Sequence, residues 1–356
     1  MFQYLSAKKK EISDFLNEFM QSESAAYAAT GRFGKDTLNR LYEFACRGKM
    51  IRGGLVVLGH ELFNGDFYSE AVKTAAALEL FQSALLIHDD IMDRDTSRRG
   101  EPTLYYQYAE ENKAAGINEF LHIGEAMGIC AGDVAFFCAY TLLAGLSLDP
   151  DKKQTVLEHI TREMGYVGTA QMLDVFFGAY NAKTADISQQ EILNLYKFKT
   201  GRYTIALPLA TGARIAGASI HNISALESLG EKLGIIFQIK DDELGLFGDT
   251  EDIGKPVGSD IREGKKTVFY QILQQQASAT EQEKLLHIFG NPDITQPDID
   301  YVRNVIEKNR VREKVSAIVD TLKKEIESHI ANIEIQNTDT HKILESLVSY
   351  SITRTI

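Results

Sequence analysis

The chain has 356 residues, of which 44% are hydrophobic and 25% are charged, and its formal net charge is -12. This composition is typical of a soluble globular protein that can bury a sizeable core. The acidic balance argues against a nucleic-acid binder, because such proteins neutralise phosphates with Lys and Arg. Cys46, Cys130 and Cys138 lack metal-ligand spacing and predict no disulfide framework. With no apolar signal-peptide region at the N-terminus, we expect a cytoplasmic protein.

Helical periodicity dominates the chain from its N-terminus onward. Helices are predicted over 71–91, 155–174, 189–203, 225–242, 298–333 and 338–349. Breaks are predicted over 100–116, 148–152, 178–188, 248–264 and 277–296. No run of alternating strands with hairpin signals is visible. We therefore predict an all-α fold, a single domain over 1–356 with about ten or more long helices around a central cavity.

The apolar segment over 126–148 is long enough to span a bilayer. Asp133 lies inside it, and it has no basic flank of the kind that orients membrane spans. These features favour a helix buried in a helical core, and we predict no membrane span.

An apolar helix meets a cluster of charges in the segment "LLIHDDIMDRDTSRRG", which covers 85–100. Asp89 and Asp93 share a helix face, and their repulsion adds to that of the helix C-terminus. This repulsion is weak if the segment is a solvated acidic loop. It is also relieved if the carboxylates bind Mg²⁺, which prefers carboxylate and phosphate oxygens. Because "FQIKDDELGLFGD" over 237–249 repeats the pattern at Asp241 and Asp242, a metal site is favoured. We expect the two acidic helix ends to face each other across one cavity.

Basic residues lie around both acidic segments, and guanidinium groups bind phosphate in a bidentate way. They are Arg98, Arg99, Lys49, Arg52, Lys199, Lys255, Lys265 and Lys266. Each taken alone is an ordinary surface charge, but as a set they fit two diphosphates. Motifs of P-loop, dinucleotide-binding, zinc-hydrolase and serine-hydrolase sites are missing from the sequence.

Six segments together resemble a known family. They are "GKMIRG", "DDIMD" followed by "RRG", "GTAQMLD", "KTG", "FQIKDD" and "GKPVGSDIREGKKT". In this order and spacing they are similar to the all-trans polyprenyl diphosphate synthases, the family of farnesyl and geranylgeranyl diphosphate synthases. The resemblance covers 48–266. It implies an isoprenoid-synthase fold, a homodimer, and transfer of an allylic group to isopentenyl diphosphate.

The resemblance also implies roles for individual residues, with about three Mg²⁺ ions, or Mn²⁺ in their place. Metal ligands would be Asp89, Asp93 and Asp241, supported by Asp90, Asp242 and Asp174. Arg98, Lys199, Lys255, Gln171 and Lys265 would bind the allylic diphosphate, with Lys266 as the substitute for Lys265. Lys49, Arg52, Gln82 and Arg99 would bind isopentenyl diphosphate. Thr200 and Gln238 would face the developing carbocation.

The sequence departs from the family pattern at several positions. Gly53 replaces the usual Pro, and Ala170 replaces the Gly next to Gln171. Gly245 stands where the second acidic motif often has its third Asp, which leaves Asp249 without an assigned role. The family's basic C-terminal tail is poorly matched, with Arg354 as a faint candidate. No catalytic His is required, and we interpret His88 as a cavity residue.

The growing product should extend back along the helix from Asp89, at about 5.4 Å per turn. Ala84 and Leu85 lie one turn back, and Ala84 is too small to close the pocket early. We predict a floor from Phe81, Phe136 and Phe137, although each is equally well an ordinary core residue. This favours geranylgeranyl diphosphate, followed by longer chains and then farnesyl diphosphate. The preferred primer and the downstream pathway do not follow from the residues.

Two other classes of protein remain as alternatives. A class I terpene cyclase shares the fold and the first acidic motif, but Lys49, Arg52 and the second Asp pair argue against it. A non-catalytic synthase subunit would carry degraded acidic motifs, and Gly245 alone leaves room for it. Both alternatives predict no condensation with isopentenyl diphosphate.

Overall fold

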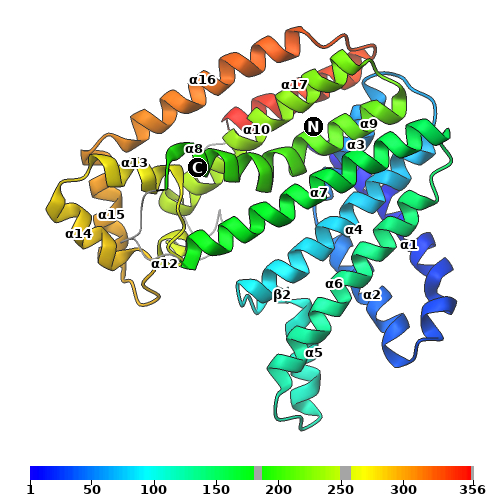
Figure 1. Cartoon of the computed structure of the whole chain (residues 1–356), viewed down its shortest axis with the longest axis horizontal. Coiled ribbons are helices and arrows are strands. Elements are labelled where there is room, and N and C mark those ends of the chain that lie inside the picture. The colour runs from blue at the N-terminus through cyan, green and yellow to red at the C-terminus, as the bar shows by residue number, and fades with distance from the viewer. Residues whose placement is uncertain (180–186, 249–257, 354–356) are drawn as a thin grey trace. The chain divides into compact units, whose positions relative to one another are not determined.

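The computed structural model describes residues 1–179, 187–248 and 258–353. This part of the chain is almost wholly helical, as Figure 1 shows, and confirms the prediction of an all-α fold. The exception is a short antiparallel hairpin of β1 (Ser97–Arg98) and β2 (Glu101–Pro102). The sequence analysis did not predict this hairpin.

The chain forms two compact units. Unit 1 comprises Met1–Glu158, Pro208–Ala218 and Ile335–Ile343, and unit 2 comprises His159–Leu207, Ser219–Glu334 and Leu344–Ile356. The single domain over 1–356 and its central cavity stay predictions.

Unit 1 is built around α4, which is apolar on nearly every side. Its helices are α1 (Phe2–Ala28), α2 (Arg32–Arg47), α3 (Ile51–Glu61), α4 (Tyr68–Met92), α5 (Leu104–Ala114) and α6 (Phe120–Ala144). A helix that is hydrophobic all round needs neighbours on several sides. Accordingly α4 packs against α3, α6 and α1, and most of its residues from Ala71 to Ala84 are buried.

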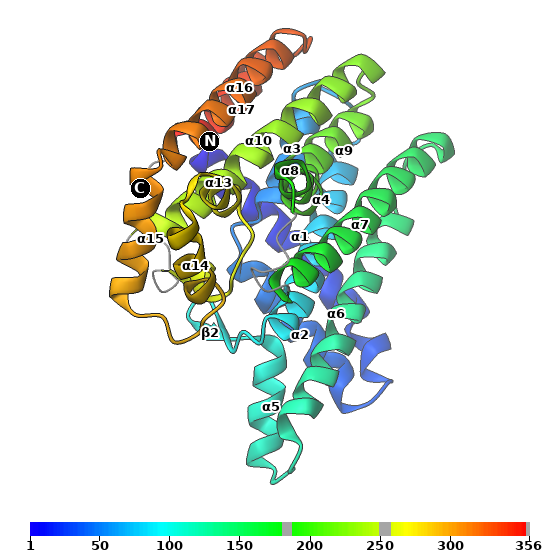
Figure 2. The ribbon, with the colours of Figure 1, turned by 60° about the vertical axis from the view of Figure 1, so that its left-hand side comes forward.

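Unit 2 is built around α10. Its helices are α8 (Gln189–Leu195), η2 (Tyr196–Ala206), α10 (Ile220–Phe247), α12 (Ser259–Arg262), α13 (Val268–Gln276), α14 (Ala279–Ile288), α15 (Gln296–Lys308) and α16 (Val311–Ala331). α10 lies beside η2 and α16, which Figure 2 also shows for α16. Gly234 permits the contact with η2, because a Cβ there would lie 2.0 Å from the Cα of Gly201. Three further helices, α7 (Pro150–Ala179), α9 (Leu207–Ala216) and α17 (Thr338–Thr353), have residues in both units.

Helix boundaries were predicted unevenly. The helices expected over 71–91, 155–174, 225–242 and 338–349 are confirmed within α4, α7, α10 and α17. The single helix predicted over 298–333 is wrong, because Arg310 adopts a left-handed conformation (φ 53°) and separates α15 from α16. The breaks predicted over 100–116 and 277–296 contain the helices α5 and α14. The segment 189–203 is helical, but η2 is a π-helix.

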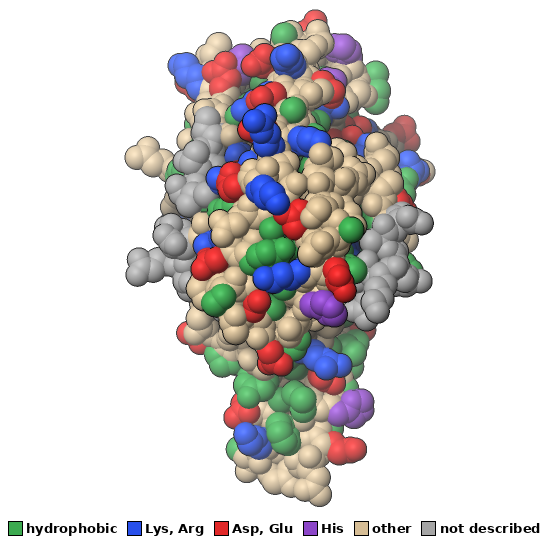
Figure 3. All heavy atoms as spheres, turned by 90° about the vertical axis from the view of Figure 1, so that its left-hand side faces the viewer, with side chains coloured by type: hydrophobic (Ala, Val, Ile, Leu, Met, Phe, Trp, Pro, Cys, Tyr) green, Lys and Arg blue, Asp and Glu red, His purple; other side chains and the backbone are tan. Residues whose placement is uncertain are grey.

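Among the described helices, α6 alone is long and apolar enough to cross a membrane, and 44% of that apolar window is buried. The helix predicted near 126–148 is confirmed over most of its length, but it is only partly enclosed. Leu121, Ile129, Phe137 and Tyr140 leave an apolar face exposed. Figure 3 shows one face of the molecule, on which acidic and basic side chains are interspersed.

Candidate active site

The first acidic segment sits on a sharply terminated helix. Arg94 adopts a left-handed conformation (φ 58°) immediately after α4. The Asp95 N–H donates to the Asp90 carbonyl at 2.8 Å, and the Arg94 N–H donates to the Ile91 carbonyl at 3.3 Å. These bonds form a Schellman motif, which satisfies the last carbonyls of the helix. The motif turns the chain directly behind the aspartates.

The two adjacent aspartates of this segment have different environments. Asp90 is fully buried, whereas Asp89 is half-buried and Asp93 is exposed. Arg98 Nε donates to Asp90 Oδ1 at 2.5 Å, and Arg98 Nη2 lies 4.0 Å from Asp89 Oδ2. Burial raises the pKa of Asp90 to about 6, against the opposing pull of Arg98. Asp90 is therefore an interior partner of Arg98, and Asp89 and Asp93 are left to face outward.

The hairpin places the two arginines of "RRG" in different surroundings. Arg99 and Gly100 both have positive φ values, 56° and 79°, which is the pattern of a type I′ hairpin turn. Arg98 lies in β1 and contacts Asp90, while Arg99 lies at the turn. A Cβ on Gly48 would be 3.1 Å from an Arg99 guanidinium nitrogen. Arg99 therefore reaches the loop between α2 and α3.

The residues predicted for isopentenyl diphosphate gather around that loop. Lys49 is exposed in it, Arg52 is at the start of α3, and half-buried Gln82 is on α4. Buried Glu79 accepts a hydrogen bond from the Gly53 N–H at 2.7 Å. Burial raises the pKa of Glu79, although Gly53, Arg52 and Arg99 oppose the shift.

Glu79 acts as a cap for α3. Met50, at the N-cap position, provides no side-chain hydrogen bond, so the first N–H groups of the helix need another acceptor. Glu79 supplies it, and a Pro at Gly53 would have no N–H to donate. The replacement of the usual Pro by Gly53 thus permits the hydrogen bond from the Gly53 N–H to Glu79.

The residues predicted to form a wall around the product tail lie in unit 1, and one of them is placed differently from the prediction. Ala84 and Phe81 are fully buried, and Leu85 is half-buried. The Phe81 ring lies 5.9 Å from that of Phe136 and 5.1 Å from that of Tyr140.

Phe137 does not belong to this wall. It is 66% exposed, because it lies on the outer face of α6. Tyr140 takes its place beside Phe81. His88 contacts the Ile129 carbonyl at 3.1 Å and stacks near Phe136, in keeping with a cavity residue.

The second acidic segment has the same division between a buried and a less buried aspartate. Asp242 is buried, whereas Asp241 is half-buried. Asp242 accepts hydrogen bonds from the Tyr196 hydroxyl and, at 3.0 Å, from Gln238 Nε2. Burial raises the pKa of Asp242 to about 8, and the nearby Asp260 adds to the effect.

The π-helix η2 presents the residues predicted for the allylic end. Lys199 is ion-paired with Asp174 of α7, and Thr200 Oγ1 donates to Gln238 Oε1 at 3.0 Å. Gln171 lies half-buried on α7, one turn before Asp174. Wide π turns are rare and are frequent at functional sites. Five residues predicted from three motifs thus lie on neighbouring elements within unit 2.

Gly245 and Asp260 explain the missing third aspartate. A Cβ on Gly245 would lie 2.4 Å from Asp260 Oδ2, so the Asp260 carboxylate occupies the space beside Gly245. Lys265 lies 3.5 Å from Asp260 and 2.9 Å from Glu263. Burial works against the charge of Lys265, but these two carboxylates outweigh it and raise its pKa.

The structure favours Lys265 over Lys266 as the loop lysine. Lys266 is buried, donates to the Gly264 carbonyl at 2.8 Å and lies over the Tyr270 ring. Lys265 is half-exposed.

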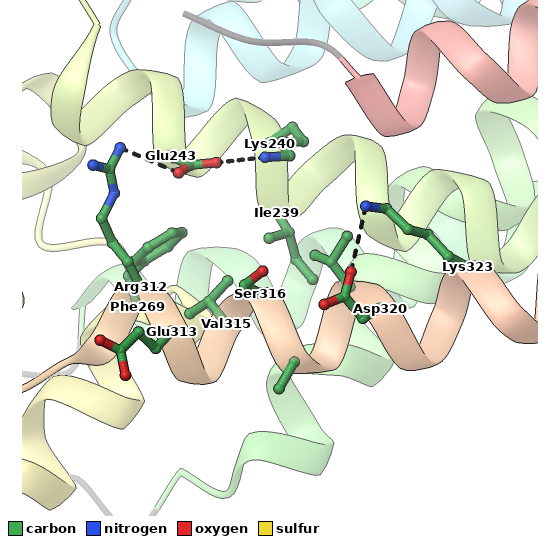
Figure 4. A pocket seen from close by; sticks show the side chains of 12 residues that line it. Ile239, Lys240, Glu243, Phe269, Arg312, Glu313, Val315, Ser316, Asp320 and Lys323 are labelled. Carbon is green, nitrogen blue, oxygen red and sulfur yellow. Dashed lines mark hydrogen bonds and ion pairs between the residues drawn. The ribbon is translucent and has the colours of Figure 1, made fainter.

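The opposite side of α10 forms a separate hollow of about 490 Å³ (Figure 4). Lys240 and Glu243 of α10 face α16 there, and Glu243 accepts from Lys240 at 2.8 Å and lies 3.2 Å from Arg312. The Glu243–Arg312 contact joins α10 to α16. Gln238 and Asp242, one turn apart on α10, instead contact Thr200 and Tyr196 of η2.

The acidic residues suit a metal that is only partly coordinated by protein. In the described ranges, no three His, Cys, Asp or Glu side chains form a ready-made metal cage. Mg²⁺ needs none, because one or two carboxylates with substrate phosphates and waters usually suffice. Asp90 Oδ2 is buried, with no hydrogen-bond partner among the described residues. These hard oxygen donors fit Mg²⁺.

Some predictions lie beyond what the structure describes. Lys255, Asp249 and Arg354 fall outside the described residues. The acidic ends of α4 and α10 belong to different units, so their facing across one cavity stays a prediction.

Sequence reasoning missed three residues that contact the predicted site. They are Glu79, Tyr196 and Asp260. Glu79 left a signal, since a lone acid in an apolar helix is seldom buried without a partner. Gly245 marked the departure from the motif, but nothing in the sequence pointed to Asp260. Tyr196 left none, because its contacts are made only in the folded chain.

Comparison with known proteins decides the family. A family model described as polyprenyl synthetase matches residues 35–306. The chain belongs to this family. The predictions of the family and of a prenyltransferase activity are therefore confirmed.

Individual members of the family cover nearly the whole chain. A short chain isoprenyl diphosphate synthase of Methanocaldococcus jannaschii is 32% identical, over 86% of this chain and 85% of its own. A geranylgeranyl diphosphate synthase of Saccharolobus solfataricus is 31% identical, over 87% and 88%. The crystal structure of geranylgeranyl pyrophosphate synthase from Corynebacterium glutamicum, complexed with isoprenyl diphosphate and magnesium, is 30% identical. It covers 99% of both chains with a TM-score of 0.89.

Proposed function

We propose that this family member condenses isopentenyl diphosphate with an allylic diphosphate to make all-trans geranylgeranyl diphosphate. One observation carries the proposal: the cations divide into separate sets. Lys49, Arg52 and Arg99 gather around the loop before α3, whereas Arg98 is tied to Asp90 at the acidic helix end. Two anionic substrates need two such sets, and a cyclase needs one.

Asp89, Asp93 and Asp241 would hold Mg²⁺, with about three ions and with Mn²⁺ as a substitute. When bound, the metal neutralises the leaving diphosphate and lowers the barrier to its departure. A structure with about 30% identity contains magnesium and isoprenyl diphosphate, which supports this assignment.

The reaction then needs no side-chain nucleophile. The allylic C1–O bond breaks, and its electron pair leaves with the diphosphate, which Arg98, Lys199, Gln171, Lys255 and Lys265 would bind. The isopentenyl double bond attacks C1 while Lys49, Arg52, Gln82 and Arg99 hold its diphosphate close. The new cation loses a proton to the departed diphosphate, which forms the product double bond. The oxygens of Thr200 and Gln238 would stabilise the allylic cation.

Product length would be set by the wall behind the first acidic segment. Ala84, a small residue one turn behind Asp89, would leave room for the product, and the Phe81–Phe136–Tyr140 cluster would close that room further back. At about 5.4 Å per helical turn, this depth fits a product longer than farnesyl diphosphate.

The test is chromatography of dephosphorylated products. Wild-type protein should make a twenty-carbon alcohol, and Phe81→Ala and Phe136→Ala should add isoprene units. Leu121→Ala is the control, because Leu121 is an exposed apolar residue of α6 outside both the wall and the proposed interface, and it should not change product length. No product without isopentenyl diphosphate is expected, and a hydrocarbon formed in its absence would favour a terpene cyclase. If neither core variant lengthens the product, the floor lies elsewhere.

We also propose that the protein is a cytoplasmic homodimer without a membrane span, with α6 at the subunit interface. Ala126, Cys130, Asp133, Phe137 and Tyr140 are exposed on α6 at alternating spacings of four and three. Such a stripe is typical of helices that pair with another helix. A second copy covers it better than lipid does, since Asp133 lies at its centre. Light scattering should show a dimer for wild type and a monomer for Phe137→Glu.

A further inference from the structure

A chain of hydrogen bonds runs through the interior of unit 2. It begins at the Val268 N–H, which donates to the Tyr196 hydroxyl oxygen at 3.0 Å. The Tyr196 hydroxyl donates to Asp242 Oδ2. The other oxygen of Asp242 accepts from Gln238 Nε2 at 3.0 Å, and Gln238 Oε1 accepts from Thr200 at 3.0 Å. The chain links the start of α13, η2 and α10.

The direction of this chain is set at its Val268 end. A main-chain N–H can only donate, so the Tyr196 oxygen is used as an acceptor there. Val268 is also the first residue of α13, where N–H groups have no partner within the helix. The Tyr196 hydroxyl is left to point its hydrogen at Asp242. In its ionised form Asp242 then accepts at both oxygens, at Oδ2 from Tyr196 and at Oδ1 from Gln238.

The orientation of Gln238 depends on that arrangement. An amide side chain has a donor end and an acceptor end of almost equal size, and only its partners decide which way it faces. With Asp242 as the acceptor, the NH₂ group of Gln238 turns toward Asp242 and its oxygen turns toward Thr200. A flipped amide would present NH₂ to Thr200.

We propose that Tyr196 is a positioning residue for prenyl transfer, which acts through Asp242 to keep the amide oxygen of Gln238 beside Thr200. The inference rests on the proposed function, in which these two oxygens face the allylic cation. An oriented oxygen dipole stabilises a cation without reorganising, whereas an amide NH₂ would repel it. Tyr196 is buried and forms no part of the predicted diphosphate or metal ligands.

The first experiment compares two tyrosines that lose only a hydroxyl. Tyr196→Phe should lower the single-turnover rate of condensation about tenfold, with dissociation constants of both diphosphates within about twofold of wild type. Tyr270→Phe is the matched control. Tyr270 is also buried in unit 2, but its hydroxyl has no hydrogen-bond partner among the described residues. It should react at the wild-type rate. Circular dichroism melting verifies that both variants are folded at the assay temperature.

The second experiment tests whether Tyr196 acts through Gln238. In a Gln238→Ala background, adding Tyr196→Phe should change the single-turnover rate by less than about twofold, because the group it positions is gone. Independent multiplication of the two losses would overturn the proposal. So would an unchanged rate in Tyr196→Phe, or an equal loss in Tyr270→Phe. Whether the wild-type protein condenses the two diphosphates tests the proposed function. The ratios of the single-turnover rates of the variants separately test the positioning role of Tyr196.

Discussion

The acidic ends of α4 and α10 each carry two consecutive aspartates, and the two ends hold the second aspartate by different contacts. Adjacent helix residues point about 100° apart, so a pair of consecutive aspartates cannot share one environment. At both ends the second aspartate is buried, with Asp90 0% and Asp242 4% exposed. The first aspartate of each pair, Asp89 or Asp241, is half-buried. The paired-Asp motif is thus one outward carboxylate and one anchor.

The anchors differ in what holds them. Asp90 is paired with the guanidinium of Arg98, and burial raises its pKa to about 6. Asp242 has the neutral donors Tyr196 and Gln238, and burial raises its pKa to about 8. A cation restrains the effect of burial more than neutral donors do. The contact at Asp90 therefore holds a charged side chain, Arg98, in place. The contacts at Asp242 instead set the direction of the hydrogen bonds with Tyr196 and Gln238.

The largest effect should come from removing the outward carboxylates. Asp89→Ala and Asp241→Ala should each lower prenyl transfer by about 10³-fold or more, since both ends would contribute to neutralising the leaving group. The measurement is product formation at saturating Mg²⁺, with exposed Asp300→Ala as a control at the wild-type rate. Unchanged turnover in both variants would show that the acidic ends hold no metal.

A smaller effect should follow from breaking the charged anchor. Arg98→Gln leaves Asp90 buried without a cation and should cost about 3–5 kcal/mol of unfolding free energy. Tyr196→Phe, which breaks the neutral anchor, should cost about 1–3 kcal/mol. Urea unfolding of both proteins measures the contrast. Asp90→Asn in the Arg98→Gln background should recover much of the loss, and a double variant no more stable than Arg98→Gln would refute the charge argument.

The smallest effect concerns Glu79, a third buried carboxylate, which is held by main-chain N–H groups. Its pKa in the folded protein is raised above 4.5 by burial. The folded state therefore keeps a proton that the unfolded chain has lost. Stability from this group is present below pH 4.5 and is lost as the pH rises through the folded pKa.

Glu79→Gln should remove this part of the pH dependence while keeping an acceptor for Gly53. Urea midpoints of the variant should fall less than those of wild type as the pH rises above about 4.5. The difference should be smaller than the loss in Arg98→Gln. Parallel curves for the two proteins would mean that Glu79 stays charged throughout.

Long, strongly apolar helices were predictable because they need only local pattern. α4 and α10 lack Pro and have a continuous apolar character, so their existence followed from the sequence. α5 and α14 were missed because each is short and lies between turn signals, where tertiary contacts decide the outcome. The division at Arg310 was missed because a left-handed Arg has no local signature.

The candidate site also contains residues that a local sequence pattern predicts and residues that only tertiary contacts place. The residues predicted to contact substrate carry a motif, and the structure brings Lys199 beside Asp174 and Thr200 beside Gln238. Their supports are set by packing across elements. Tyr196 and Asp260 come from segments far from Asp242 and Gly245 in the chain, and Phe137 was misplaced because helix rotation was not known. Spacing along the chain predicts candidate site residues, but not the side chains that hold them in place.

The π-helix η2 makes chain length itself a constraint near Lys199. Each i→i+5 ring encloses one residue more than an α-helical ring. The segment between α8 and α9 therefore holds more residues than an α-helix of the same length would. Deleting one residue would let the segment close as an ordinary α-helix. Lys199 and Thr200 would then be rotated relative to the helices on either side. In this segment the chain's register, as much as its residue types, keeps Lys199 beside Asp174 and Thr200 beside Gln238.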